Sequence, residues 1–195
     1  MPKLYPGYRD EIQKKIVGTA AEYFLAKGFE RTTMEEIAAS LGVTKPALYR
    51  YYKNKDELFF AVVTEIMMTE FNRIFSVSFK SDDLNSCAEL FFDAILELEH
   101  KYPMMAQDVD YVFSRNESFR KGIFEMITKG LQPLQEFFET QKRKGNIKTD
   151  IEADDLAILC GSLSTGLTHN VAKGMDPVQA KRIWLLGFSK LTCTN

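Results

Sequence analysis

A short stretch of the sequence carries the cationic and aromatic side chains that nucleic-acid recognition needs. Lys45 and Arg50 can bond the O6 and N7 atoms of guanine, and the hydroxyl groups of Tyr49 and Tyr51 can bond backbone phosphates. The small side chains between them would let a helix backbone enter the major groove and touch a thymine methyl group. We therefore predict a double-stranded DNA interface, with Lys55 as a further phosphate contact. The predicted DNA contacts are Thr33, Thr44, Lys45, Pro46, Ala47, Tyr49, Arg50, Tyr51 and Lys55.

Two short helices joined by a tight turn must position these side chains. Thr33 and Glu36 have the spacing of a capping box, which predicts that the first of the two helices begins there. Gly42 can adopt the left-handed conformation of a sharp turn. Thr44 is then the predicted cap of the second helix, whose first turn tolerates Pro46 because the amide that proline lacks would be unpaired there. This order is typical of a helix-turn-helix.

The rest of the chain reads as amphipathic helices, so the predicted fold class is all-α. Apolar residues spaced four apart from Ile12 to Phe24 predict a helix over residues 9–27 that stops at Gly28. A three-helix N-terminal domain is followed by longer helices, with a kink expected at Pro133. These helices are predicted over residues 55–77, 82–101, 103–115, 117–144, 153–173 and 177–192.

Charge divides the chain into two predicted domains, residues 1–55 and 56–195. The first domain has 10 basic and 6 acidic residues, a net charge of +4, whereas the second has 15 and 21, a net charge of −6. The total of −2 excludes indiscriminate coating of nucleic acid by bulk charge. Any DNA binding must therefore come from a small set of placed cations in the first domain.

The segment TTMEEIAASLGVTKPALYRYYKNKDELF, residues 32–59, resembles the signature of the TetR family of transcriptional regulators. The preceding AEYFLAKGFERTT resembles that family's first helix and its Gly-Phe step, although Tyr52 stands where many members have Phe. The resemblance implies a regulator, expected to be a repressor, that binds a palindromic DNA operator as a homodimer. It also implies that a small molecule bound in the second domain releases the DNA.

The last two helices carry apolar stripes that could pair with a second copy of the chain. In the family that this chain resembles, this pair of helices forms a four-helix dimer interface. The alternative is that the stripes belong to the core of a single chain. The predicted interface residues are Leu156, Leu159, Leu163, Leu167, Ile183, Trp184, Gly187 and Leu191.

The middle helices are rich in Phe and Met, which can line an adaptable apolar pocket. We expect a small hydrophobic effector there, although the same side chains could serve only as core. The predicted pocket residues are Met67, Phe71, Phe92, His100, Met104, Asp108, Tyr111, Phe124 and His169.

Patterns for catalysis, cofactors and metals are weak. Glu97 and His100 form one ExxH pair, but His169 has Gly166 in the matching place, so a paired di-metal site is not expected. No phosphate-binding or dinucleotide-binding glycine loop occurs. We therefore expect no enzyme, no cofactor and no metal. The remaining rival to a ligand-responsive regulator is a ligand-independent DNA-binding structural or nucleoid protein.

The sequence also bears on compartment. The three cysteines are widely spaced, the first 16 residues lack an apolar signal region, and no apolar run approaches the roughly 18 residues of a membrane span. A cytoplasmic protein without membrane contact is the expectation.

Overall fold

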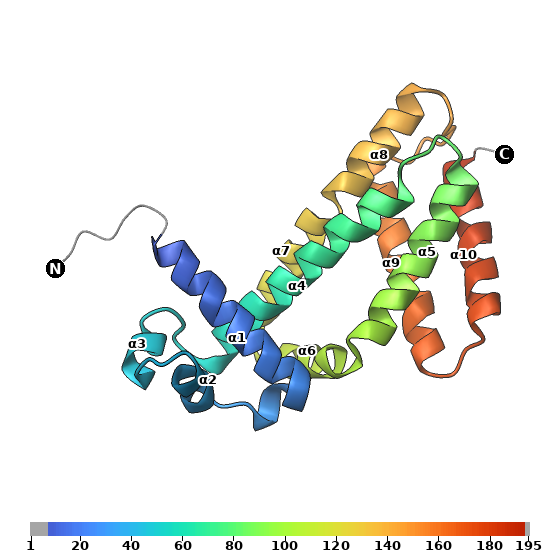
Figure 1. Cartoon of the computed structure of the whole chain (residues 1–195). Coiled ribbons are helices and arrows are strands. Elements are labelled where there is room, and N and C mark those ends of the chain that lie inside the picture. The colour runs from blue at the N-terminus through green and yellow to red at the C-terminus, as the bar shows by residue number, and fades with distance from the viewer. Residues whose placement is uncertain (1–7, 194–195) are drawn as a thin grey trace. The chain divides into compact units, whose positions relative to one another are not determined.

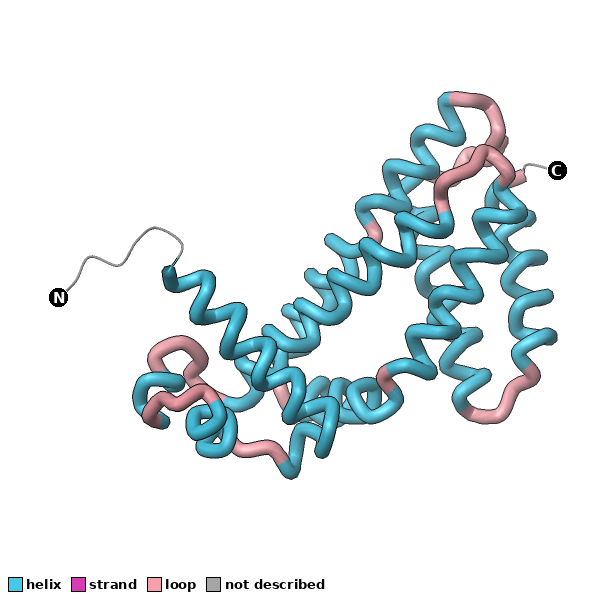
Figure 2. The backbone as a smooth tube through the Cα atoms, in the orientation of Figure 1, coloured by secondary structure: helices cyan, strands magenta, loops and turns pink. Residues whose placement is uncertain are grey.

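The computed structural model describes residues 8–193, and within that range the chain forms ten helices joined by loops (Figures 1 and 2). The predicted all-α fold is confirmed. The helices are α1 (Tyr8–Arg31), α2 (Met34–Ser40), α3 (Lys45–Tyr49), α4 (Lys55–Ser78), α5 (Leu84–Lys101), α6 (Pro103–Arg115), α7 (Glu117–Gly130), α8 (Gln132–Arg143), α9 (Ala153–Ala172) and α10 (Pro177–Thr192). None of them is both long enough and apolar enough to cross a membrane.

The predicted helix over residues 117–144 is wrong in one respect, because it is two helices rather than one kinked helix. α7 ends at Gly130 and α8 begins at Gln132, with Leu131 between them. Pro133 lies in the first turn of α8, where its missing N–H costs nothing. The proline therefore starts a new helix instead of bending an old one.

The chain separates into two compact units, and the division between them does not fall at residue 55, where the sequence predicts it. The N-terminal unit contains the residues up to Met67 together with Tyr102–Glu125. The C-terminal unit contains Met68–Lys101 and the residues from Met126 onward. All of α6 and the start of α7 thus belong to the same unit as the helix-turn-helix.

Aromatic rings from three parts of the chain fill the core of the N-terminal unit. The ring of Phe59 on α4 lies 5.1 Å from that of Phe24, 4.9 Å from that of Phe29 and 5.9 Å from that of Phe119, measured between centroids. Burial of such rings is the main favourable term in folding. The cluster joins α1, α4 and α7 into one body that carries α2 and α3.

The C-terminal unit is built around Trp184 of α10. Its side chain is fully buried against Phe91, Phe92 and Phe188. Its indole N–H donates to the carbonyl oxygen of Ala88 on α5 at 2.7 Å, so the one polar atom of the ring is satisfied. Residues from α5, α8, α9 and α10 share this core.

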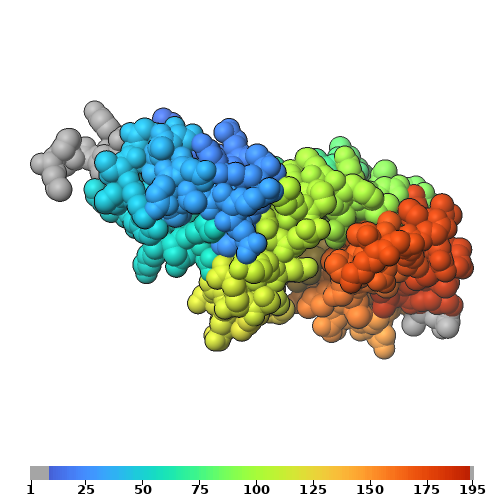
Figure 3. Space-filling view, turned by 90° about the horizontal axis from the view of Figure 1, so that it is seen from below, coloured from blue at the N-terminus to red at the C-terminus, as the bar shows by residue number. Residues whose placement is uncertain are grey.

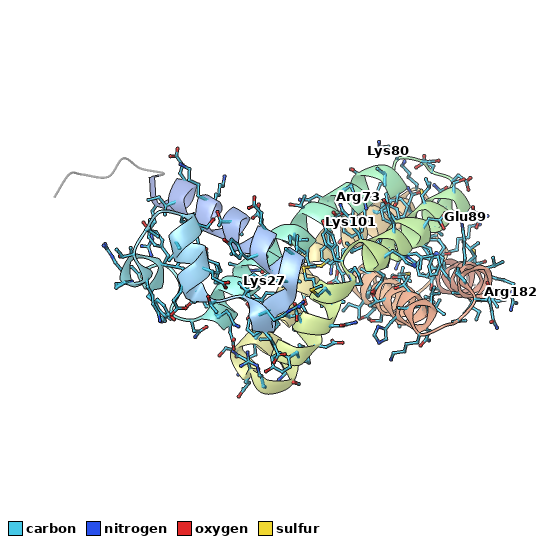
Figure 4. All side chains as sticks on the ribbon, turned by 60° about the horizontal axis from the view of Figure 1, so that its bottom comes forward. Lys27, Arg73, Lys80, Glu89, Lys101 and Arg182 are labelled. Carbon is cyan, nitrogen blue, oxygen red and sulfur yellow. The ribbon has the colours of Figure 1, made fainter. Side chains whose placement is uncertain are left out.

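One buried charge in the C-terminal unit is also fully paired. The carboxylate of Glu70 on α4 accepts hydrogen bonds from Arg73 Nε at 2.8 Å and from Lys101 Nζ at 2.6 Å. Figure 4 shows the side chains of Arg73 and Lys101 close together. A buried carboxylate without such partners would be strongly destabilising.

Candidate nucleic-acid interface

The predicted capping box at the start of α2 is confirmed. The Thr33 hydroxyl accepts the Glu36 N–H at 3.2 Å, and the Glu36 carboxylate accepts the Thr33 N–H at 2.9 Å. Lys27 on α1, labelled in Figure 4, forms an ion pair with the same carboxylate. The hydrogen bonds from Lys27 and then from Thr33 lower the pKa of Glu36 to about 2. Glu36 therefore stays ionised and ties α2 to α1.

The turn into α3 has the predicted glycine, but Thr44 does not cap α3 with its side chain. Gly42 adopts a φ of 67°, as the prediction requires. Thr44 makes no side-chain cap hydrogen bond, because one of the amides that it could cap belongs to Pro46 and does not exist. The Ala47 N–H donates instead to the Thr44 carbonyl oxygen at 2.9 Å. The Thr44 hydroxyl is thus exposed and uncommitted to the helix.

Helix α3 buries one side and exposes the other. Leu48 and Tyr52 are buried and anchor the helix to the N-terminal unit. Of the predicted contact residues on or beside α3, Ala47 and Tyr51 are half-buried, and those on the exposed side are Thr44, Lys45, Pro46, Tyr49 and Arg50. This exposure is a requirement for DNA contact, and the contacts themselves remain predictions.

The two predicted base-reading cations differ in their surroundings. Lys45 forms an ion pair with Glu35 of α2, and its Nζ atom lies 5.6 Å from the centroid of the Tyr49 ring. The hydrogen bond to Glu35 raises the pKa of Lys45. Arg50 makes no ion pair with any residue between 8 and 193. Arg50 is therefore available to a ligand without breaking an existing pair, whereas Lys45 must exchange partners.

Lys55, the predicted phosphate contact at the start of α4, points into the protein. Its ammonium group donates to the carbonyl oxygens of Phe29 at 2.8 Å, Thr32 at 3.0 Å and Glu30 at 3.3 Å. Burial lowers the pKa of Lys55. The Lys55 ammonium is thus occupied by backbone carbonyl oxygens of the N-terminal unit.

The nine predicted pocket residues are divided between the two units. Met67, Met104, Asp108, Tyr111 and Phe124 lie in the N-terminal unit, and the other four lie in the C-terminal unit. Those four are Phe71, Phe92, His100 and His169.

Several of these side chains have surroundings that do not suit a pocket wall. Phe92 is fully buried against Trp184, whereas Phe124 and both histidines are exposed. Two open hollows, of about 390 Å³ beside α4 and about 500 Å³ beside α8, are lined by none of the nine predicted residues.

The residues of the ExxH pair already have protein partners. Glu97 accepts a hydrogen bond from Arg73, and the Nδ1 atom of His100 lies 2.8 Å from the carbonyl oxygen of Leu96. Among residues 8–193, no group of three or more His, Cys, Asp or Glu side chains is placed to hold a metal ion.

The predicted interface on α9 and α10 requires a correction. Trp184 and Leu156 are fully buried in the core of their own chain, and Leu167 is nearly so. Leu159 remains 43% exposed. Leu163, Ile183, Gly187 and Leu191 are half-buried. The core alternative thus holds for Trp184 and Leu156, and the dimer contacts of the other residues stay predictions.

The structure also leaves exposed two apolar side chains that are not among the predicted interface residues. Leu186 is 58% exposed on α10, and Ile158 is exposed beside Leu159 on α9. Figure 3 shows part of the surface of these two helices, coloured orange to red.

A helix-turn-helix with an exposed second helix and a following helical unit is typical of a class of DNA-binding regulators. Residues 16–62 match the sequence model described as "Bacterial regulatory proteins, tetR family". Over these residues the chain is similar to the helix-turn-helix region of the TetR family of transcriptional regulators.

The sequence is similar to that of two named transcriptional regulators. It is 28% identical over 133 residues to the HTH-type transcriptional activator FasR of Mycolicibacterium smegmatis, a match that covers 62% of this chain and 61% of FasR, less than two thirds of its length. It is 21% identical over 179 residues to the HTH-type transcriptional repressor Rv1474c of Mycobacterium tuberculosis, covering 91% of each chain.

The fold is similar to that of solved regulators. FadR of Thermus thermophilus, a TetR-family repressor solved in complex with lauroyl-CoA, superposes with a TM-score of 0.73 at 15% identity, covering 94% of this chain and 96% of FadR. FadR of Bacillus subtilis, solved in complex with stearoyl-CoA, superposes with a TM-score of 0.66 at 17% identity, covering 91% and 97%. These similarities establish the shared fold.

Proposed function

We propose that this protein is a homodimeric repressor that binds a palindromic DNA operator through α3 and is released by a hydrophobic small molecule. The observation that carries the proposal is the exposed side of α3, where Arg50 has no ion pair among the described residues. Leu48 and Tyr52 fix that side outward by burial beneath it. Arg is the side chain best suited to bidentate contact with guanine.

Two observations support the proposed homodimer: the small size of one reading helix and the apolar surface of the last two helices. α3 has five residues, and a single helix-turn-helix contacts too few base pairs for operator-level specificity. Leu159 on α9 and Leu186 on α10 are both large, apolar and exposed, which favours burial against another copy. A two-fold dimer would then match a palindromic site.

Two solved structures of the same fold and the amino-acid composition of this chain support an acyl-CoA as the effector. Two FadR proteins of the same fold were solved with lauroyl-CoA and stearoyl-CoA bound. The present chain has 15 Phe and 8 Met residues, which suit an adaptable apolar site. We carry the acyl-CoA class over to this protein as the effector to test. Release requires that the effector bind the DNA-incompetent arrangement more tightly than the competent one.

The test begins with duplexes selected by the purified protein from a random-sequence pool. Fluorescence anisotropy then follows a labelled selected duplex while lauroyl-CoA is added, with free coenzyme A as the matched control. We expect a palindromic consensus and release by lauroyl-CoA alone. Selection that recovers no consensus would remove the operator proposal, and release by both compounds equally would remove the hydrophobic effector.

The structural or nucleoid protein remains the second candidate, because one observation favours it. The chain is 33% identical over 78 residues to the nucleoid occlusion factor SlmA of Mannheimia succiniciproducens, a match that covers 40% of this chain and 36% of SlmA. This candidate predicts DNA binding that no acyl compound alters. The same titration therefore separates the two.

A further inference from the structure

The break in α1 leaves backbone groups that need partners. Gly28 interrupts the helix with φ 82° and ψ 168°, a conformation that costs other residues more than glycine. Backbone N–H and C=O groups at such a break lose their helical partners and must find others. Part of the demand is met locally, since the Thr32 hydroxyl donates to the Gly28 carbonyl oxygen at 2.8 Å.

The N–H of Phe29, directly after the break, donates a hydrogen bond to a side chain of α6. The Oδ2 atom of Asp108 accepts this N–H at 2.7 Å. Burial raises the pKa of Asp108, and the hydrogen bond from Phe29 partly opposes that rise. A half-buried carboxylate is therefore committed to a single backbone amide of α1.

The carbonyl oxygen of Phe29 accepts a hydrogen bond from a side chain of α4. The ammonium of Lys55 donates to the Phe29 carbonyl oxygen at 2.8 Å and to two neighbouring carbonyls, of Glu30 and Thr32. Its Nζ atom also lies 4.2 Å from the centroid of the Phe29 ring. An ammonium carries three N–H donors and no acceptor. Three carbonyl oxygens within 3.3 Å use them all and leave none for a phosphate.

Phe29 is thus held on both sides, by Asp108 at its N–H and by Lys55 at its C=O. We call these three residues the Phe29 clamp. The chain runs from the clamp through Thr32 directly into Thr33, the cap of α2. The clamp therefore fixes the point at which the helix-turn-helix departs from α1, and all of its parts lie within the N-terminal unit.

We propose that Lys55 and Asp108 are positioning residues for DNA recognition, acting through the backbone of Phe29 rather than by touching DNA. This inference rests on the proposed DNA-binding function. The opposing hypothesis is the phosphate contact that the sequence predicts for Lys55. The two differ in ionic-strength dependence, since each phosphate contact adds about 0.9 to the slope of log affinity against log salt.

The first experiment compares Lys55→Met with Arg50→Met on a duplex selected from the random pool. Methionine keeps an unbranched apolar stem and removes the ammonium group. We expect Lys55→Met to weaken binding roughly tenfold, as for loss of charged hydrogen bonds, with the salt slope unchanged. Arg50→Met removes a proposed guanine contact and should lower the affinity and relax the base preference. A slope that falls for Lys55→Met by the amount of a phosphate contact would overturn the proposal.

The second experiment compares Asp108→Asn with Asp108→Leu. The Asn side-chain oxygen can still accept the Phe29 N–H, whereas Leu has a similar size and no acceptor. We expect Asp108→Asn to bind the duplex like the unmodified protein and Asp108→Leu to bind roughly tenfold more weakly. If both variants bound the duplex normally, or if both bound it equally weakly, the positioning role of Asp108 would be contradicted.

Hydrogen exchange separates failure of the clamp from failure of the proposed function. Exchange at the Phe29 amide should be faster in Asp108→Leu than in Asp108→Asn, while the amides of α9 and α10 exchange unchanged and show that the variant is folded. This measurement needs no DNA. If the unmodified protein bound no duplex, the proposed function would fail, and exchange at Phe29 would still decide whether the clamp exists.

Discussion

The two units of this protein use their polar side chains in different ways. In the N-terminal unit, Thr33, Lys55 and Asp108 each bond backbone groups at the end or break of a helix. In the C-terminal unit, the fully buried rings of Trp184 and Phe92 dominate the core. Hydrogen bonds of these polar side chains thus hold the start of α2 and the break in α1 in the first unit, whereas packed rings dominate the core of the second.

Helices α9 and α10 show how packing divides one apolar stripe. Trp184 is fully buried, and Leu186, two residues later, is 58% exposed. Both are large and apolar, so the difference is one of direction around the helix rather than of residue type. Core stability and the proposed dimer should therefore respond to different residues of the same helix.

The largest expected effect tests the core side of that division. Trp184→Ala should lower the free energy of unfolding by about 3–5 kcal/mol, because it removes a fully buried ring and the hydrogen bond from its indole N–H to the Ala88 carbonyl oxygen. Urea unfolding followed by circular dichroism measures this loss. Val178→Ala, at a side chain that is 75% exposed, is the control and should change it by less than about 0.5 kcal/mol. Equal losses would mean that Trp184 is not a core residue.

The exposed side of the same helix should affect association instead. Leu186→Glu should weaken the proposed dimer by about 1.5–3 kcal/mol, the value of burying one Leu side chain, while the monomer keeps its helical content. Sedimentation velocity over a dilution series measures the shift, and Leu90→Glu on exposed α5 surface is the matched control.

Since Trp184 is buried within its own chain, its emission wavelength should stay constant on dissociation. A red shift on dilution would contradict that placement.

Within the N-terminal unit, the two cations of α3 should contribute unequally to DNA binding. Arg50→Ala should cost about 1–3 kcal/mol on the selected duplex and relax the base preference. Lys45→Ala should cost less, because Lys45 must first leave Glu35. Anisotropy titrations of both variants, with exposed Lys14→Ala on α1 as control, measure the order. If Lys45→Ala proved the more costly, the ion pair with Glu35 would not be limiting.

How far the sequence predicts each region depends on the separation of the bonded residues. The capping box joins Thr33 and Glu36, three residues apart, and the turn needs only Gly42, so local spacing predicts both. The clamp joins Lys55 to Phe29 across 26 residues and Asp108 to Phe29 across 79. Nothing in the local pattern of either side chain indicates that partner. For this reason the sequence predicts a phosphate contact at Lys55 and a pocket residue at Asp108.

In the C-terminal unit too, local spacing does not predict contacts between residues that are far apart in the sequence. The helical period identifies Leu156, Leu159, Trp184 and Leu186 as apolar positions of α9 and α10. Which of them face α5 depends on contacts such as that of Trp184 with Ala88, 96 residues away. Periodicity therefore predicts the helices, and only the packed structure separates core from surface.

The smallest expected effect concerns the capping box, and its sign follows from the pKa of Glu36. Hydrogen bonds from Lys27 and Thr33 lower this pKa from 4.5 to about 2, so the folded protein holds the carboxylate charged where the unfolded chain would take up a proton. The resulting stabilisation is present above pH 4.5 and is lost as the pH falls towards about 2.

Glu36→Gln removes only the stabilisation that depends on the charge of Glu36. Glutamine can still accept the Thr33 N–H but carries no charge to pair with Lys27. The melting temperature of the unmodified protein should exceed that of Glu36→Gln at neutral pH, and the difference should shrink as the pH falls from 4.5 to about 2. Thermal unfolding across that range measures the difference. Glu35 and the other carboxylates titrate in both proteins, so their contribution cancels. A difference that stayed constant or grew on acidification would show that the charge of Glu36 does not stabilise the start of α2.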